Sequence, residues 1–200
     1  MGHRFAELAF TDQVKDAQAT QGSREGYARL EGSDVHHDRL GPDEAAFLAA
    51  RDSFYMATVG ATGWPYVQHR GGPAGFLKVL DERTVGFADF RGNRQYVSVG
   101  NLAGDDRVSL ILVDYPNRRR LKLLGRARAV TPERDPGLLA RLELPGYRAR
   151  VERGLLIAVQ AFDWNCPQHL TPRFTEAEVA AAVAPLHARI AELEAALGAR

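Results

Sequence analysis

The sequence predicts a mainly β protein of the α+β class, with an antiparallel barrel flanked by helices near both ends of the chain. Two observations predict this class. Several short apolar runs with the alternation typical of strands occupy the middle of the chain, and helical patterns precede and follow them. Because tight turns separate most of the runs, we expect antiparallel neighbours and a barrel, and not a parallel sheet.

The composition excludes several classes of protein. The chain has 200 residues, of which 45% are hydrophobic and 26% charged, which is enough to bury a core and too hydrophobic for a disordered chain. Its 26 basic residues nearly balance its 25 acidic residues, so the bulk charge argues against a nucleic-acid binder. The single cysteine excludes an internal disulfide and a cysteine-rich zinc site.

The sequence shows no targeting or membrane segment. Its first residues lack the long apolar run of a signal peptide, and nowhere do 18 apolar residues follow one another. We therefore expect a cytoplasmic protein with no membrane partner.

Residues 1–51 have the pattern of a polar, helical extension. Thr11 can cap a helix over residues 12–20, whereas residues 21–38 are rich in Gly, Ser, Asp and His and favour a loop with little helix. Within that loop, the His36-His37 pair is expected on the solvated surface, with metal binding as the alternative. Another helix should run from Pro42 to about Arg51, because proline in the first turn followed by carboxylates is typical of a helix start.

Residues 52–174 form the predicted barrel domain. The strand candidates are residues 54–59, 64–69, 76–80, 84–87, 107–115, 119–130 and 155–162. In the run 119–130, strict alternation places Leu121, Leu123, Gly125, Ala127 and Ala129 on one face. We expect about six strands from these runs.

Residues 175–200 have the pattern of a single helix. Thr175-Glu176-Ala177-Glu178 is a capping box. Apolar residues then step by four and three positions, namely Val179, Val183, Leu186, Ile190, Leu193 and Leu197. This narrow stripe should pack either on the barrel or on a partner subunit. Pro185 lies inside the run and should kink the helix.

The first candidate ligand loop spans residues 69–78. It holds three glycines and a proline between Arg70 and Lys78, and such a loop lets the backbone come close to a ligand. It matches neither the Walker A motif nor the Rossmann fingerprint, which argues against tightly bound ATP or NAD in the usual folds.

The second candidate ligand loop spans residues 89–96. Its turn at Gly92 and Asn93 leads into a predicted helix that ends near Asn101, so free N–H groups and the Arg94 guanidinium can meet a phosphate. The two loops together predict a site for a phosphate monoester. The alternative is a pair of hairpin loops with solvated arginines.

Two further clusters allow more than one interpretation. Arg118-Arg119-Arg120 is either a nucleic-acid patch or a hairpin tip with Arg120 turned inward, and the absence of stacking aromatics favours the tip and no nucleic-acid partner. Cys166 is either a small loop residue or a thiol that His169 activates.

Three runs of the barrel region form a specific combination: Phe76-Leu77-Lys78, Arg107-Val108-Ser109-Leu110, and the stretch from Arg119 to Ala127. This combination resembles the pyridoxamine 5′-phosphate oxidase family of FMN-binding split barrels, over roughly residues 52–173. A bacterial subgroup related to that oxidase is similar also in the Arg-Gly-Gly loop, the Gly-Asn-Arg turn and the tail from Trp164 to His169. The resemblance implies a homodimer of six-stranded split barrels with two FMN sites at its interface.

The resemblance also implies which residues bind FMN. They are Arg70, Gly71, Pro73, Ala74, Gly75, Phe76, Leu77, Lys78, Ala88, Asp89, Asn93, Arg94, Gln95, Arg120, Trp164 and Arg173. Arg70, Lys78 and the turn Asn93-Arg94 would hold the phosphate end, and the last three residues would surround the flavin ring. Gln95 stands where the family has a lysine, so one phosphate charge is missing.

The sequence departs from the authentic oxidase in its substrate residues. The family's Tyr, Arg and Ser grip on the substrate phosphate is missing before the last strand, and the tail lacks the family's Arg-x-His. The resemblance therefore implies an FMN-dependent oxidoreductase acting on another small molecule, with electrons from NAD(P)H or passed to oxygen. The flavin would carry the hydride chemistry, so we assign no catalytic side chain and no metal. The alternatives are a flavin carrier or sensor without turnover, and a barrel that binds haem or a deazaflavin.

Overall fold

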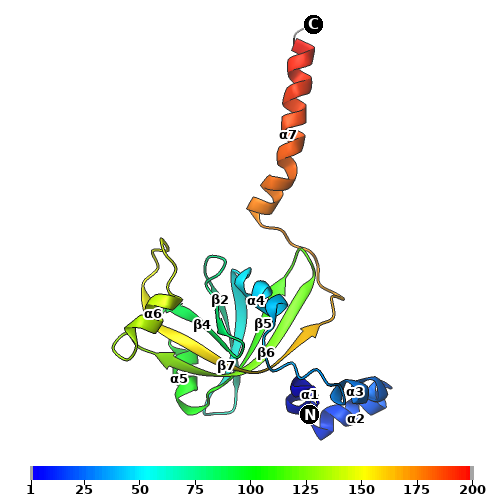
Figure 1. Cartoon of the computed structure of the whole chain (residues 1–200), viewed down its shortest axis with the longest axis vertical. Helices are drawn as coiled ribbons and strands as arrows, with labels where there is room; N and C mark the ends of the chain where they lie inside the picture. Colours follow the sequence, from blue (N-terminus) through cyan, green and yellow to red (C-terminus); the bar gives the residue numbers. More distant parts are fainter. Residues whose placement is uncertain (1, 199–200) are drawn as a thin grey trace.

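Seven strands form one antiparallel sheet in the computed structural model, which describes residues 2–198. In chain order the strands are β1 (Ser53–Val59), β2 (Pro65–Gly71), β3 (Lys78–Asp81), β4 (Thr84–Phe90), β5 (Arg107–Asp114), β6 (Arg119–Val130) and β7 (Val151–Asn165). Their order in the sheet is β2-β1-β5-β6-β7-β4-β3, which leaves β2 and β3 at the edges. Figure 1 shows the sheet with helices at both ends of the chain.

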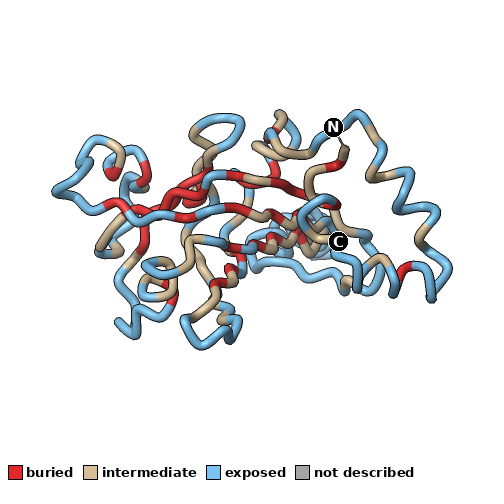
Figure 2. Tube along the Cα trace, turned by 90° about the horizontal axis from the view of Figure 1, so that it is seen from below, coloured by how far each residue is buried: buried red, intermediate tan, exposed pale blue. Residues whose placement is uncertain are grey.

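The main core lies on one face of this sheet, as strand alternation requires, and a smaller cluster that includes Ala88 and Leu156 lies beside α6. Phe54 and Met56 of β1 are buried, and the residues next to them along the strand are not. Leu121 and Leu123 of β6 are fully buried in the same cluster. Figure 2 shows the buried residues gathered along the strands, whereas the outlying helices are mostly exposed.

Each of the seven predicted runs forms a strand, so the expected number of about six strands is one too low. The difference lies in β3, which has only 4 residues and pairs with β4 alone. The predicted face of β6 is confirmed as far as Ala127, but Ala129 is exposed and Val130 is buried.

Four helices precede the sheet: α1 (Arg4–Ala9), α2 (Asp12–Thr20), α3 (Arg24–Glu31) and α4 (Pro42–Ala49). The Thr11 side chain caps α2 by accepting a hydrogen bond from Val14 N at 3.4 Å, as predicted. Helix α3 takes up 8 residues of the stretch 21–38, in which we expected a loop with little helix. Helix α4 inserts Phe47 and Leu48 into the core, which anchors the extension to the barrel.

Three more helices complete the described chain: α5 (Val97–Gly104), α6 (Pro136–Leu142) and α7 (Glu176–Gly198). Helix α6 packs Leu139 and Leu142 near β4 and β7 and was not predicted. Helix α7 begins at the predicted capping box and continues through Pro185 as one helix. It projects away from the barrel (Figure 1), so the stripe does not pack on its own domain. Across residues 2–198, no helix is both long and apolar enough to cross a membrane.

Candidate functional site

Two adjoining cavities of about 260 and 280 Å³ lie between β2 and β4, beside the loop that enters α5. We call them together the β2–β4 cavity. Both are lined by Gln68, Arg70, Asp89, Phe90 and Gly92. Small-molecule sites usually measure about 300–1,000 Å³. Each half is slightly smaller than that, so an organic ligand would have to use both.

A buried ionic cluster forms one wall of this cavity. Arg70 Nη1 donates a hydrogen bond to Asp89 Oδ1 at 2.7 Å, and Arg153 Nε lies 3.3 Å from the other carboxylate oxygen. Asp89 is 6% exposed. The β4–β7 pairing sets this geometry, because Asp89 lies directly opposite Arg153 in the sheet. Two guanidinium groups therefore share the Asp89 carboxylate, and Arg153 is also paired with Glu152 at 2.9 Å.

The hydrogen bonding of this cluster is incomplete. The Nε groups of Arg70 and Arg153 are buried and have no hydrogen-bond partner of suitable geometry. Burial raises the pKa of the Asp89 carboxyl, and the two neighbouring guanidinium groups act in the opposite direction. An unpaired buried N–H group costs free energy that an incoming acceptor would recover. The wall is therefore suited to an anionic ligand.

The loop over residues 91–96 forms the opposite rim. Arg94 and Tyr96 both adopt positive φ, at 64° and 54°, and the Asn93 side chain accepts a hydrogen bond from Gln95 N at 3.2 Å. Arg94 Nε donates to the Tyr96 hydroxyl at 3.4 Å, and that hydroxyl donates to Glu152 at 3.1 Å. Arg94 is exposed on the cavity, so its guanidinium is free to turn toward a ligand.

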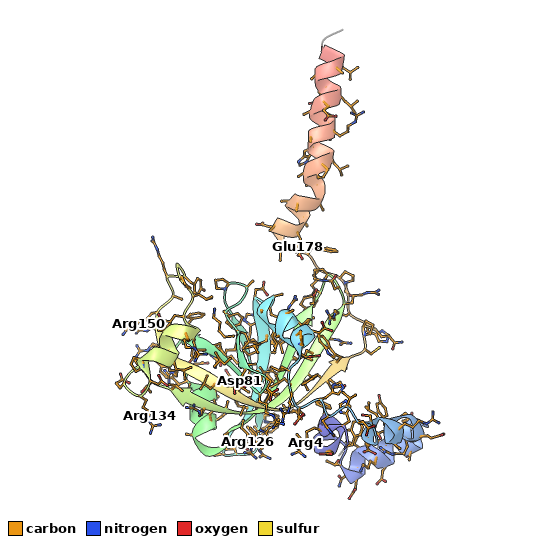
Figure 3. The ribbon with its side chains drawn as sticks, in the orientation of Figure 1. Arg4, Asp81, Arg126, Arg134, Arg150 and Glu178 are labelled. Carbon is orange, nitrogen blue, oxygen red and sulfur yellow. The ribbon has the colours of Figure 1, made fainter. Side chains whose placement is uncertain are left out.

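Glu152 connects this rim to the ionic cluster. Although its partial burial acts to raise the pKa of the Glu152 carboxyl, hydrogen bonds from Tyr96 and Arg153 leave that pKa below its ordinary value. Arg91 also approaches Glu152, and its backbone N–H donates to the carbonyl of Arg150, which is labelled in Figure 3. Glu152 is thus an ionised acceptor that orients the rim.

The structure brings together the polar half of the predicted site. The cavity walls include Arg70, Gly71, Phe76, Ala88, Asp89, Asn93 and Arg94. Pro73, Ala74 and Gly75 form an adjacent turn, in which Phe76 N donates to Pro73 O at 2.9 Å. Leu77 is 1% exposed and belongs to the core, and Lys78 begins β3. Gln95 is exposed on the rim.

The three predicted ring residues lie elsewhere in the chain. Trp164 packs edge-on against Phe47, and its Nε1 donates to Glu44 at 2.8 Å. Arg120 is turned onto the tail segment, where it donates to the carbonyl oxygens of Cys166 and Gln168. Arg173 lies over the Tyr115 ring at 4.9 Å.

The two groups are separated by the length of β7. Asp89 pairs with Arg153 near the start of this strand, and Arg120 pairs with Asn165 at its end. A strand of 15 residues spans roughly 50 Å when extended. One chain therefore does not bring Arg120 to the β2–β4 cavity.

Glu152 and Arg153 were not predicted as site residues, and Tyr96 had no predicted role although it lies in the predicted loop 89–96. Their roles follow from strand pairing across β4 and β7, which local sequence patterns do not specify. A charged pair at the start of a buried strand is the one local signal that could have drawn attention to Glu152 and Arg153. Among residues 2–198, no cluster of three or more His, Cys, Asp or Glu side chains is arranged to hold a metal ion.

Comparison with known proteins finds one matching family. The model of the family described as pyridoxamine 5′-phosphate oxidase matches residues 40–150, which include the whole cavity except its β7 wall. No protein with a curated function matches the sequence.

Several solved structures share the fold at low sequence identity. HupZ of Group A Streptococcus is 15% identical with a TM-score of 0.50, and the alignment covers 68% of this chain and 100% of HupZ. A putative pyridoxamine 5′-phosphate oxidase of Lactobacillus delbrueckii is 17% identical with a TM-score of 0.48, covering 63% of this chain and 94% of that one. An FMN-binding protein of Syntrophomonas wolfei is 11% identical with a TM-score of 0.48, and the alignment covers 74% of this chain and 97% of that protein. The likeness to HupZ supports the barrel fold and nothing finer.

Proposed function

The chain belongs to the pyridoxamine 5′-phosphate oxidase family, and from that membership we propose that it binds FMN in the β2–β4 cavity. The observation that carries the proposal is Arg70 in the cavity wall, whose Nε atom is buried and has no hydrogen-bond partner. Arg94 on the opposite rim and the backbone N–H groups at the start of α5 would complete a phosphate cradle. FMN supplies a phosphate monoester that fits such donors.

We further propose that the binding unit is a homodimer. The outer face of β1 and β2 exposes Tyr55 and Val67, and Trp64 beside it is 78% exposed. Adjacent exposed aromatic and aliphatic side chains on an edge of the sheet are typical of a subunit interface. A second copy seated there would also close a cavity that one chain leaves open.

The activity that this site supports best is an FMN-dependent oxidation or reduction of a small organic molecule. When bound, the flavin supplies hydride transfer between a donor such as NAD(P)H and an acceptor such as oxygen. The chain's own residues would bind the flavin and orient it. Arg70 and Arg94 fix the anionic end, and the apolar Phe87 and Phe90 beside the cavity exclude water. The alternative is a flavin carrier or sensor, for which both redox states bind but no donor and acceptor pair gives turnover.

The test is the visible absorption spectrum of the purified chain before and after FMN is added. Arg94→Ala should weaken FMN binding by tenfold or more, because a charge-assisted hydrogen bond contributes about 1.5–3 kcal/mol. The matched control is Arg126→Ala on β6. This change removes an exposed guanidinium that pairs with Asp106 and does not line the cavity. Wild-type chain that takes up no FMN, or equal binding by the two variants, would reject the proposed cradle. A haem spectrum in place of a flavin spectrum would favour the haem alternative.

A further inference from the structure

Helix α7 presents an apolar stripe that none of residues 2–198 covers. Within Glu176–Gly198 no residue is buried, and the helix stands clear of the sheet (Figure 1). Leu186 is 63% exposed and Leu197 is 70% exposed. Single exposed leucines are ordinary, but here they recur at regular spacing along one face of a helix of 23 residues. The regular spacing points to a macromolecular partner.

The stripe follows a heptad repeat. Positions a and d are filled as follows: Val183, Ile190 and Leu197 at a, and Val179, Leu186 and Leu193 at d. A β-branched residue at a combined with leucine at d favours a parallel two-stranded coiled coil, and the two central layers have this combination. Pro185 falls at position c, outside the seam, so it does not obstruct the contact. The repeat therefore specifies both the number of helices and their direction.

The flanking charges agree with that direction. Arg189 lies at g and Glu194 at the following e position, so parallel helices place each Arg189 beside the Glu194 of the other helix. An antiparallel pair would instead set Arg189 against alanine or another Arg189, because g positions then face each other. In the single chain Arg189 donates to Glu192 at 2.7 Å, and both side chains are about two-thirds exposed. Arg189 is thus free to exchange this contact for one across the seam.

The start of the helix is fixed independently of the barrel. Thr175 Oγ1 accepts a hydrogen bond from Glu178 N at 3.2 Å, and Glu178 in turn accepts one from Thr175 N at 2.7 Å. Figure 3 shows Glu178 at the base of the helix, beyond the edge of the barrel. At about 1.5 Å per residue, the 23 residues of α7 extend roughly 35 Å, which accommodates three heptads.

We propose that α7 pairs with α7 of a second copy of this chain in a parallel, in-register coiled coil. This inference is independent of the flavin proposal, because none of its residues lies in the β2–β4 cavity. A dimer that the barrel faces alone hold together would leave the stripe exposed.

The test is disulfide trapping in the full chain. In a Cys166→Ser background, which removes the one native thiol, Leu193→Cys places a cysteine at d and Ala195→Cys places one at the outward f position. A parallel, in-register pair should convert most of the Leu193→Cys chain to a disulfide-linked dimer under mild oxidation and little of the Ala195→Cys chain. Equal trapping of the two variants, or none at residue 193, would overturn the proposal.

A charge exchange tests the direction separately. Added to the Leu193→Cys chain, Arg189→Glu or Glu194→Arg alone puts like charges across the seam and should reduce trapping severalfold at low salt. The double variant Arg189→Glu with Glu194→Arg restores opposite charges and should restore trapping. If the double variant traps no better than either single variant, the parallel arrangement is wrong.

Discussion

Asp89 is the residue on which the cavity wall depends most directly. It is 6% exposed and pairs with two guanidinium groups, that of Arg153 opposite it on β7 and that of Arg70 on β2. Arginine remains charged at any accessible pH, so removal of the carboxylate would leave the Arg70 guanidinium without its counterion and Arg153 with Glu152 alone. Loss of the Asp89 carboxylate should therefore lower the free energy of unfolding strongly, although burial itself disfavours the ionised form of that carboxyl.

Asp89→Asn should therefore lower the free energy of unfolding by about 3–5 kcal/mol, the usual cost of breaking a buried ion pair from one side. Urea denaturation of the chain without added flavin measures this. Asp106→Asn is the matched control, because Asp106 pairs with Arg126 at an exposed site and its loss should cost about 0–1 kcal/mol. Similar losses in both variants would show that Asp89 does not hold the wall together.

At the scale of elements, the N-terminal helices are attached to the sheet by a histidine pair. The rings of His3 and His37 stack at 4.3 Å, and the ring of His37 lies 5.0 Å from Phe162 on β7. His3 is 1% exposed, and its Nδ1 has no partner. The expectation of a fully solvated His36-His37 pair is therefore wrong for His37, because α1 folds back over it.

This attachment should weaken in acid. Burial and the neighbouring His37 lower the pKa of His3, and Asp163 acts in the opposite direction. A lowered pKa in the folded state means that the unfolded chain binds the proton more readily. Stability is then complete above the ordinary histidine pKa and falls as the pH drops below it.

Between about pH 7.5 and 5.5 the wild type should lose more stability than His3→Gln, measured by thermal unfolding. His187→Gln, on exposed α7, should behave as the wild type does, and an unchanged pH response in His3→Gln would contradict this role of His3.

The strands could be predicted from the sequence because each is short, alternating and bounded by turns. Helix α6 could not, although the Asp135 side chain caps it by accepting from Leu138 N at 2.9 Å. Its cap and its first-turn proline were visible, but Gly137 and a length of 7 residues weakened the helical pattern. Most element positions thus followed from local pattern, whereas α6 is held mainly by the packing of Leu139 and Leu142.

The site residues also differ in whether a local pattern could predict them. Arg70, Asn93 and Arg94 were predictable because glycine-rich turns beside cations lie within single loops. Arg153 was not, because it reaches the site through the pairing of β4 with β7. The positions of Arg120 and Trp164 relative to the cavity depend on how chains assemble, and a single sequence does not specify that geometry.

At the scale of the whole molecule, one chain holds two incomplete halves of the expected site. Arg70 and Arg94 line the cavity together with Glu152 from the start of β7, and Arg173 lies on the segment beyond the end of that strand, over Tyr115. A two-fold homodimer contains each half twice, so the cavity of one copy can meet the far end of its partner. We propose this arrangement for the flavin ring, as an extension of the homodimer proposal.

The arrangement predicts complementation between two defective chains. Arg94→Ala and Arg173→Ala should each reduce bound FMN, the first by loss of a phosphate donor and the second by loss of a cation at the ring. When the two variants are coexpressed, random pairing makes half of the dimers mixed, and each mixed dimer has one site with both arginines intact. Bound FMN should then recover to about one quarter of the wild-type sites, because a two-fold dimer carries two sites. Absorption of the purified mixture, corrected for protein, measures the recovery.

If both arginines acted within one chain, every site in the mixture would lack one of them, and binding would stay at the level of the single variants. Near-normal binding by Arg173→Ala alone would remove Arg173 from the site.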